Sequence, residues 1–148
     1  MNKAYAVGFG VLCLACVTLL AFAGAGASPL ANKHRVVFQV TSEGDDQWDA
    51  LLGNIENVRT AFGPETTEIA VVAHGKGLGM VVAANNKHSE RMKALAEGGV
   101  AFVACENTMK KKKVTKDQLL PFATTVDSGV AEVVRKQEQG WSYIKSGT

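Results

Sequence analysis

The stretch "GVAFVACENTMKKKK", residues 99–113, decides the fold of this chain. Residues 100–105 are almost continuously apolar, which is typical of a strand covered on both faces in a parallel sheet. The residues after them, up to about Lys112, favour a short helix. Cys105 stands at the junction, where the strand ends and the helix begins. The question is whether this cysteine is reactive or only a small buried residue.

The same strand pattern recurs along the chain. Two further runs are rich in β-branched residues and nearly continuously apolar, and two shorter runs follow nearer the C-terminus: residues 35–41, 68–74, 122–126 and 141–145. Helical patterns alternate with these strands. Alternation of this kind predicts βαβ units around a parallel sheet.

The intervening helices are indicated by apolar residues at helical spacing. The helix after the first strand has one face formed by Leu51, Ile55, Val58 and Phe62, and Gly63-Pro64 ends it. A second helix carries Met92, Leu95 and Ala96 on one side. Ser128 is expected to cap a last helix, with Val130, Val133, Val134 and Gln137 on one face. We therefore predict an α/β fold: a three-layer α/β/α sandwich with a mostly parallel sheet of about five strands, flavodoxin-sized.

The N-terminal residues read as a secretory signal peptide. Residues 1–27 carry a positive charge near their start, at Lys3, and continue through an apolar stretch. They end in Ala25-Gly26-Ala27, a pattern typical of signal-peptidase sites. We predict cleavage after Ala27, which leaves residues 28–148 as one domain in the periplasm or outside the cell, with no membrane attachment. The alternative is an uncleaved inner-membrane anchor formed by residues 7–23, because this run approaches the roughly 20 residues that span a bilayer.

Cleavage changes the cysteine count. Cys13 and Cys16 would leave with the signal, so Cys105 would be the only cysteine of the mature protein and could form no internal disulfide. Loss of Lys3 lowers the formal net charge of +2 to about +1, too weak a charge to indicate a nucleic-acid partner.

Cys105 has two interpretations. At a helix N-terminus, near backbone N–H groups and cations, the pKa of a thiol falls and the thiolate becomes a nucleophile. Glu106 opposes this effect, since a neighbouring negative charge disfavours the thiolate. In the other interpretation Cys105 is a small buried residue of the core.

Other polar groups gather near the same edge of the predicted sheet. Lys110, Lys111, Lys112 and Lys113 contribute positive charge or contact an anionic partner, or they simply complement the helix dipole and face solvent. His74 ends the strand of residues 68–74 and could assist Cys105, or it could be structural. The histidines show no spacing that predicts a metal site, and we expect no cofactor.

Three glycines follow His74. Gly75, Gly77 and Gly79 form G-x-G-x-G, which differs from the G-x-G-x-x-G dinucleotide fingerprint. Such a loop can cradle an anion, or it can turn the chain closely past neighbouring segments.

With these residues in view, the chain resembles the DsrE/DsrF-like family, and within it the exported branch described as intracellular-sulfur-oxidation-like. The resemblance spans about residues 34–145 and is carried by these segments: "HRVVFQVT", "EIAVVAHGKGLGM", "GVAFVACENTM" and "VDSGVAEVVRKQEQGWSYIK". It implies a parallel α/β/α sandwich that assembles into oligomers. Sulfur-relay members use a cysteine as persulfide carrier, and Cys105 matches that position.

Three functions remain open from the sequence. The leading hypothesis is an exported sulfur carrier or sulfurtransferase-like protein, with a protein sulfur donor or acceptor as partner. The second is a non-enzymatic binding or assembly module of the cell envelope, a homo-oligomer in which Cys105 is structural. The third is binding of a nucleotide or other small anion at the glycine loop, although no P-loop lysine motif is present.

Overall fold

Five parallel strands form the sheet, and each lies within two residues of its predicted position. The computed structural model describes Met1 and residues 33–146, so the predicted signal peptide lies outside the described residues apart from Met1. The strands are β1 (His34–Val40), β2 (Thr67–Ala73), β3 (Ala101–Cys105), β4 (Thr124–Val126) and β5 (Ser142–Ser146). They lie in the order β4-β3-β2-β1-β5, and every neighbouring pair is parallel. The predicted α/β class and parallel sheet are confirmed.

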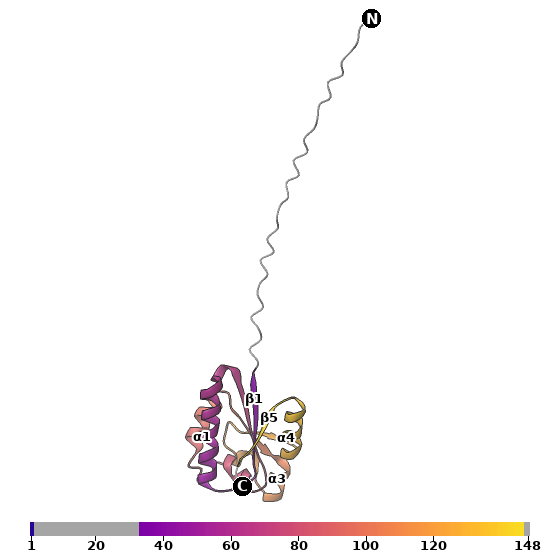
Figure 1. Ribbon diagram of the computed structural model, residues 1–148. Coiled ribbons are helices and arrows are strands. Elements are labelled where there is room, and N and C mark those ends of the chain that lie inside the picture. The colour runs from indigo at the N-terminus through magenta and orange to yellow at the C-terminus, as the bar shows by residue number, and fades with distance from the viewer. Residues whose placement is uncertain (2–32, 147–148) are drawn as a thin grey trace. The chain divides into compact units, whose positions relative to one another are not determined.

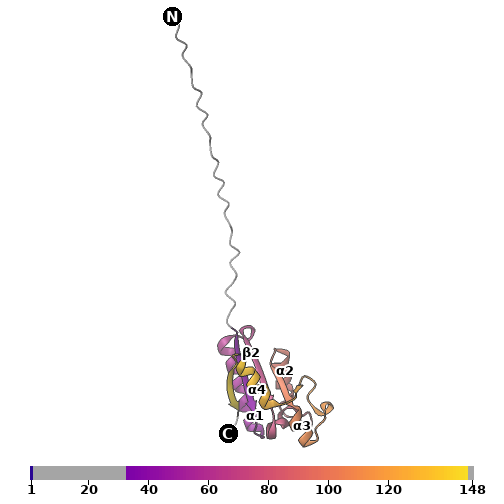
Figure 2. The ribbon, with the colours of Figure 1, turned by 90° about the vertical axis from the view of Figure 1, so that its right-hand side faces the viewer.

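Helices connect the strands and cover both faces of the sheet. The α-helices are α1 (Asp45–Phe62), α2 (Ser89–Glu97), α3 (Glu106–Lys112) and α4 (Gly129–Glu138), with short 3₁₀ helices η1 (Pro64–Thr66), η2 (Gly75–Val81) and η3 (Lys116–Gln118). Figure 1 shows α1 on one side of the sheet and α4 on the other, and Figure 2 gives the view turned by 90°. The arrangement is the predicted three-layer sandwich.

The strand order explains this placement. From β1 to β4 each strand is added on the same side of its predecessor, whereas β5 returns to the far side of β1. Crossovers between parallel strands are right-handed, so a connection that runs in the opposite direction places its helix on the opposite face. Helix α4, which makes that last connection, therefore covers the face that α1 does not.

The two faces are packed unequally. The α1 face holds a large apolar cluster in which Phe38, Val71 and Phe102 from the strands meet Leu52 and Met92 from the helices. The α4 face holds a small cluster of five buried residues: Val37, Ala70, Val72, Val103 and Val133. We call these the large face and the small face. Burial of apolar side chains, worth about 1.5–3 kcal/mol each, therefore comes mostly from the large face.

Helix α4 differs from the expected packing. Ser128 caps it as predicted, since its Oγ accepts a hydrogen bond from the backbone N–H of Ala131. Of the valines expected on one face, however, only Val133 is buried, while Val130 is 56% and Val134 is 47% exposed. One helix lying across a sheet contacts it along a narrow line, so Val130 and Val134, which flank that line, remain exposed.

The segment after His74 also differs from a simple glycine turn. Residues 75–81 form η2, which begins where Gly75 takes a φ of 58°, a left-handed conformation that glycine adopts without strain. Within residues 33–146, no helix is long and apolar enough to cross a membrane.

Candidate functional site

Three strand ends bring polar side chains together on the small face. Alternate residues of a strand point to opposite faces, so Gln39 on β1 shares the face of Val37, and Cys105 on β3 shares the face of Val103. Ala73 pairs with Ala104, which places the next residues, His74 and Cys105, side by side at the carboxyl edge. The structure therefore brings together two of the residues predicted for the site, His74 and Cys105.

Hydrogen-bond donors surround the Cys105 sulfur. Burial raises the pKa of the Cys105 thiol, but it is outweighed by hydrogen bonds from the Thr108 hydroxyl and from the backbone N–H groups of Gly129, Thr108 and Asn107. The pKa consequently lies below its ordinary value. Cys105 is the residue immediately before α3, so the N–H groups of the first helical turn have no partner within the helix and can bind an anion. The Asn107 N–H is shared, because it also donates a hydrogen bond of 3.2 Å to the Asp127 carbonyl oxygen.

Gly129 is the contact that α4 makes with this site. A Cβ on Gly129 would lie 3.0 Å from the His74 Cβ and 3.1 Å from the Cys105 Cβ, closer than side chains normally pack. A glycine therefore lets the start of α4 approach both strand ends. This close approach places the Gly129 N–H near enough to the sulfur to lower the pKa of Cys105.

Thr108 connects the thiol to η2. The backbone N–H of Gly75 donates a hydrogen bond of 3.1 Å to the Thr108 Oγ1. The Thr108 hydroxyl oxygen accepts the hydrogen bond from Gly75, so the hydroxyl hydrogen of Thr108 can be donated to the Cys105 sulfur. The first glycine of the predicted loop thus acts through Thr108.

The other two glycines are explained by packing. A Cβ on Gly77 would lie 2.3 Å from the carbonyl oxygen of Val40, and one on Gly79 would lie 3.1 Å from the Trp48 ring. Both positions need a residue without a side chain because a neighbour occupies that space. An anion-binding role for Gly77 stays a prediction.

His74 is held by a chain of side chains that reaches the surface. Gln39 Nε2 lies 2.8 Å from His74 Nε2, and the Tyr143 hydroxyl donates to the Gln39 Oε1. A carboxamide nitrogen only donates, so His74 Nε2 is the acceptor and the ring proton is on Nδ1. Burial lowers the pKa of His74, which favours the neutral ring at neutral pH.

The charge of Glu106 is compensated away from the sulfur. Its carboxylate accepts a hydrogen bond of 2.7 Å from the Thr125 hydroxyl and lies 3.1 Å from the Lys116 ammonium. These two contacts lower the pKa of Glu106, so the carboxyl stays ionised. Its negative charge is shared with Lys116, which reduces its opposition to the thiolate.

The lysine run lies at the far end of α3. Lys110, Lys111 and Lys112 occupy the last turn and are exposed, and Lys113 follows with a φ of 56°. Cations at this end complement the helix dipole. The groups that lower the Cys105 pKa are Thr108 and backbone N–H groups, and no lysine is among them. A partner contact for the lysines stays a prediction. Over residues 33–146, no group of histidine, cysteine and carboxylate side chains is arranged to hold a metal ion.

Sequence reasoning missed four residues of this site: Gly129, Thr108, Gln39 and Tyr143. A usable signal existed for two of them. A glycine directly after a capping serine is a poor helix former and indicates close packing. A threonine three residues after a strand-end cysteine lies within reach of the first helical turn. Gln39 and Tyr143 are separated by 104 positions, and neither belongs to a local motif.

The fold and the site define a small parallel α/β protein with a hydrogen-bonded thiol, Cys105, at the carboxyl edge of its sheet. The chain belongs to the DsrE/DsrF-like family, whose model matches residues 34–146. This family is associated with sulfur relay.

Solved structures similar to this chain include two that match it over nearly their whole length. MTH1491 of Methanobacterium thermoautotrophicum, a protein of unknown function, is 32% identical with a TM-score of 0.72, and the match covers 76% of this chain and 99% of that one. The ychN protein of E. coli has a TM-score of 0.60 over 76% of this chain and 98% of its own, but at 8% identity it shows the fold alone. A search of curated proteins finds no match.

Proposed function

We propose that this protein is an exported sulfur carrier that holds sulfane sulfur as a persulfide on Cys105. The observation that carries the proposal is the convergence of the Thr108 hydroxyl and the N–H groups of Gly129, Thr108 and Asn107 on one sulfur. Hydrogen bonds to the charged form favour it, and they favour a persulfide anion for the same reason. Membership of a family associated with sulfur relay supports the same chemistry.

The transfer step is a thiol–disulfide-type exchange. The Cys105 thiolate attacks the outer sulfur of a donor persulfide, R–S–SH, and a new S–S bond forms while the donor's S–S bond breaks. The electron pair leaves with the donor sulfur, which takes up the proton as R–SH. An acceptor thiolate then attacks the outer sulfur on Cys105 and regenerates the Cys105 thiolate, so no external oxidant or reductant is needed.

Mass spectrometry tests this proposal directly. The chain is prepared with Cys13→Ser and Cys16→Ser, so that Cys105 is its only thiol, and is exposed to inorganic polysulfide. We expect a gain of one sulfur atom that is removed by a reducing agent. The matched control adds Cys105→Ser and should gain none. Equal gains in both chains, or no gain in either, would exclude the carrier role.

Export is part of the proposal and rests on residues 1–27. Sequencing the N-terminus of the protein recovered from the periplasm should find Ser28 as the first residue. Recovery of full-length chain with the inner membrane would instead support the anchor formed by residues 7–23.

A second candidate function is favoured by burial. Cys105 is only 4% exposed, which suits a structural thiol, while Val130 and Val134 leave an apolar stripe on α4 in solvent. Tyr143 and Ile144 are also exposed on β5, a strand at the edge of the sheet. Exposed apolar residues near an open edge are typical of assembly surfaces. A homo-oligomeric envelope module is therefore the alternative.

Two measurements separate the candidates. A carrier should be alkylated at Cys105 in the native state at neutral pH, whereas a structural thiol should react only after denaturation. Light scattering of wild type and of a Val130→Ser, Val134→Ser variant tests assembly. Loss of an oligomer in the variant would support the alternative, in which these valines form the assembly surface.

A partner with acidic groups, docking on Lys110, Lys111 and Lys112, is the protein donor or acceptor that the carrier role requires.

A further inference from the structure

A pocket lies at the C-terminal ends of η2 and α3, the two elements whose N-terminal ends help to form the thiol site. Its volume is about 410 Å³, and its walls come from α1, η2, the loop after η2, and the end of α3. At the thiol site, Gly75 from η2 bonds to Thr108 from α3. The pocket is instead lined by Gly79 from η2 and Lys112 from α3. We call it the Trp48 pocket. Ligand sites are usually cavities of roughly 300–1,000 Å³ lined mainly by apolar side chains with a few polar groups.

One wall of the pocket is a fixed aromatic ring. The Trp48 indole N–H donates a hydrogen bond of 3.1 Å to the backbone oxygen of Ser42, so the ring's polar group is already engaged. Gly79 packs against the ring, where a Cβ would lie 3.1 Å from it, and the His88 ring lies edge-to-face with it at 6.4 Å between centroids. These contacts hold the ring in place and leave an apolar surface towards the pocket.

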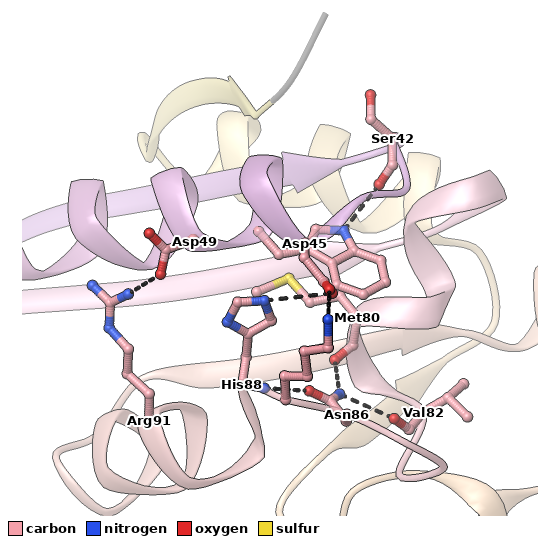
Figure 3. Close-up of polar contacts among 10 residues, drawn as sticks. Ser42, Asp45, Asp49, Met80, Val82, Asn86, His88 and Arg91 are labelled. Carbon is pink, nitrogen blue, oxygen red and sulfur yellow. Dashed lines mark hydrogen bonds and ion pairs between the residues drawn. The ribbon is translucent and has the colours of Figure 1, made fainter.

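The opposing loop is also held in place. The Asn86 side chain donates to the backbone oxygens of Met80 and Val82, at 2.8 and 3.0 Å, and accepts from the His88 N–H at 3.0 Å. Figure 3 shows these bonds beneath the start of α1, where Asp45 faces His88. A loop tied at three points gives a preformed wall, which lowers the entropic cost of binding.

The polar groups at the rim select the charge of a ligand. The ammonium of Lys112 forms no ion pair with any residue in the described part of the chain, and the pocket lining contains no carboxylate. Asn85 takes a left-handed φ of 55°, and its carboxamide has no hydrogen-bond partner among residues 33–146. One cation and one free carboxamide match the needs of a carboxylate.

We propose that the Trp48 pocket binds a small organic anion with a flat aromatic body. The ring lies against the Trp48 indole and the apolar side chains of Val82 and Val114. The carboxylate lies at the rim, where Lys112 supplies the charge and Asn85 a hydrogen bond. This assignment is independent of persulfide chemistry at Cys105, since none of the pocket residues is among the groups that hydrogen-bond to the sulfur.

The test uses 1-naphthoate as probe and its neutral analogue 1-naphthamide as control. The full chain is labelled with ¹⁵N, and the indole N–H signals of Trp48 and Trp141 are assigned with a Trp141→Phe variant. We expect 1-naphthoate to shift the Trp48 signal saturably and leave the Trp141 signal in place. The amide should bind more weakly, by up to about fivefold, as expected for one partly exposed ion pair.

Two lysine variants make the result specific. Lys112→Gln should weaken 1-naphthoate binding to the level of the amide, and Lys111→Gln, which changes the same charge one residue away from the pocket, should leave it unchanged. A shift that does not saturate, or equal effects of the two variants, would overturn the proposal. A Trp48→Leu chain that folds should not bind the probe, but the lysine pair decides the question even if that chain does not fold.

Discussion

The two faces of the sheet divide the roles of stability and chemistry: the large face contributes most of the buried apolar packing, and the small face carries the candidate site. The large face buries Phe38, Phe102 and their helix partners in a continuous apolar cluster. The small face has an apolar cluster of only five buried residues, yet it carries Gln39, His74 and Cys105 at its carboxyl edge. A single covering helix leaves room at its N-terminus for polar groups to meet, which a fully packed face would not. The face with the smaller apolar cluster is therefore the one that can hold a reactive group without disturbing the core.

The sharpest test of this division is a substitution on the large face. Gly77→Ala places a Cβ 2.3 Å from the Val40 carbonyl oxygen, so backbone must move. Overpacking of this kind costs about 3 kcal/mol of unfolding free energy. Urea denaturation followed by circular dichroism measures it.

A glycine on the same face provides the control. Gly53 lies within α1, where an added Cβ would meet only the end of the Arg91 side chain at 3.8 Å. Gly53→Ala should stabilise the protein by up to about 1 kcal/mol, because alanine is the better helix former. Equal stability of the Gly77→Ala and Gly53→Ala variants would contradict the close packing of Gly77 against Val40.

The corresponding glycine of the small face should behave differently. Gly129→Ala brings a Cβ to 3.0 Å from the His74 Cβ and 3.1 Å from the Cys105 Cβ, a contact that small shifts of α4 can relieve. We expect a loss of only about 1 kcal/mol in stability, together with a clear loss of thiol reactivity at neutral pH. Iodoacetamide kinetics and urea denaturation on one preparation measure both. A large loss of stability with unchanged alkylation would contradict the division.

A smaller change isolates the thiol chemistry from packing. Thr108→Val keeps the side-chain shape but removes the hydroxyl that donates to Cys105, so the pKa of Cys105 should rise. Alkylation at neutral pH should slow roughly three- to tenfold, as expected when one hydrogen bond to an anion is lost. The rate is followed by mass spectrometry across the pH range.

Thr125→Val is the matched control for this experiment. It removes the same group from β4, but that hydroxyl donates to Glu106 rather than to the sulfur. Its alkylation profile should follow the wild type. Similar slowing in both variants would mean that Thr108 acts on the fold and not on the thiol.

The smallest expected effect concerns pH and stability. Burial lowers the pKa of His74 in the folded state, so the unfolded chain binds its proton more readily. Stability should therefore fall as pH decreases through the ordinary histidine range, from about pH 8 to about pH 5, and His74→Gln should reduce that fall. Urea midpoints at the two ends of this range test it. An unchanged pH dependence in the variant would place the effect elsewhere.

The parts of this structure that the sequence predicts are those with local causes. Buried parallel strands read as continuous apolar runs, so residues 68–74 and 100–105 predict β2 and β3 closely. Cys105 could be placed at the thiol site because a strand and a helix meet there. For Gly129 the signal is partial: a glycine after the capping Ser128 indicates close packing, but no local pattern shows that Cys105 is the residue it packs against.

The remaining features depend on contacts across the chain. The link from Tyr143 through Gln39 to His74 joins three neighbouring strands of the sheet, and only the strand order β2-β1-β5 brings them together. The exposure of Val130 and Val134 likewise follows from how one helix lies on the sheet. Helical periodicity identifies an apolar stripe, but it does not determine how wide a surface that stripe meets.

The return of the chain to the far side of β1 has a consequence for the order of events during synthesis. Cys105 is made before Gly129, and before Tyr143 on the last strand, so an incomplete chain carries its thiol without the α4 N–H group and without the support of His74 from β5. The thiolate-stabilising environment is completed only when the C-terminal segment docks. The pKa of Cys105 is therefore lowered fully only after the residues from Gly129 onward have been made and have docked on the sheet.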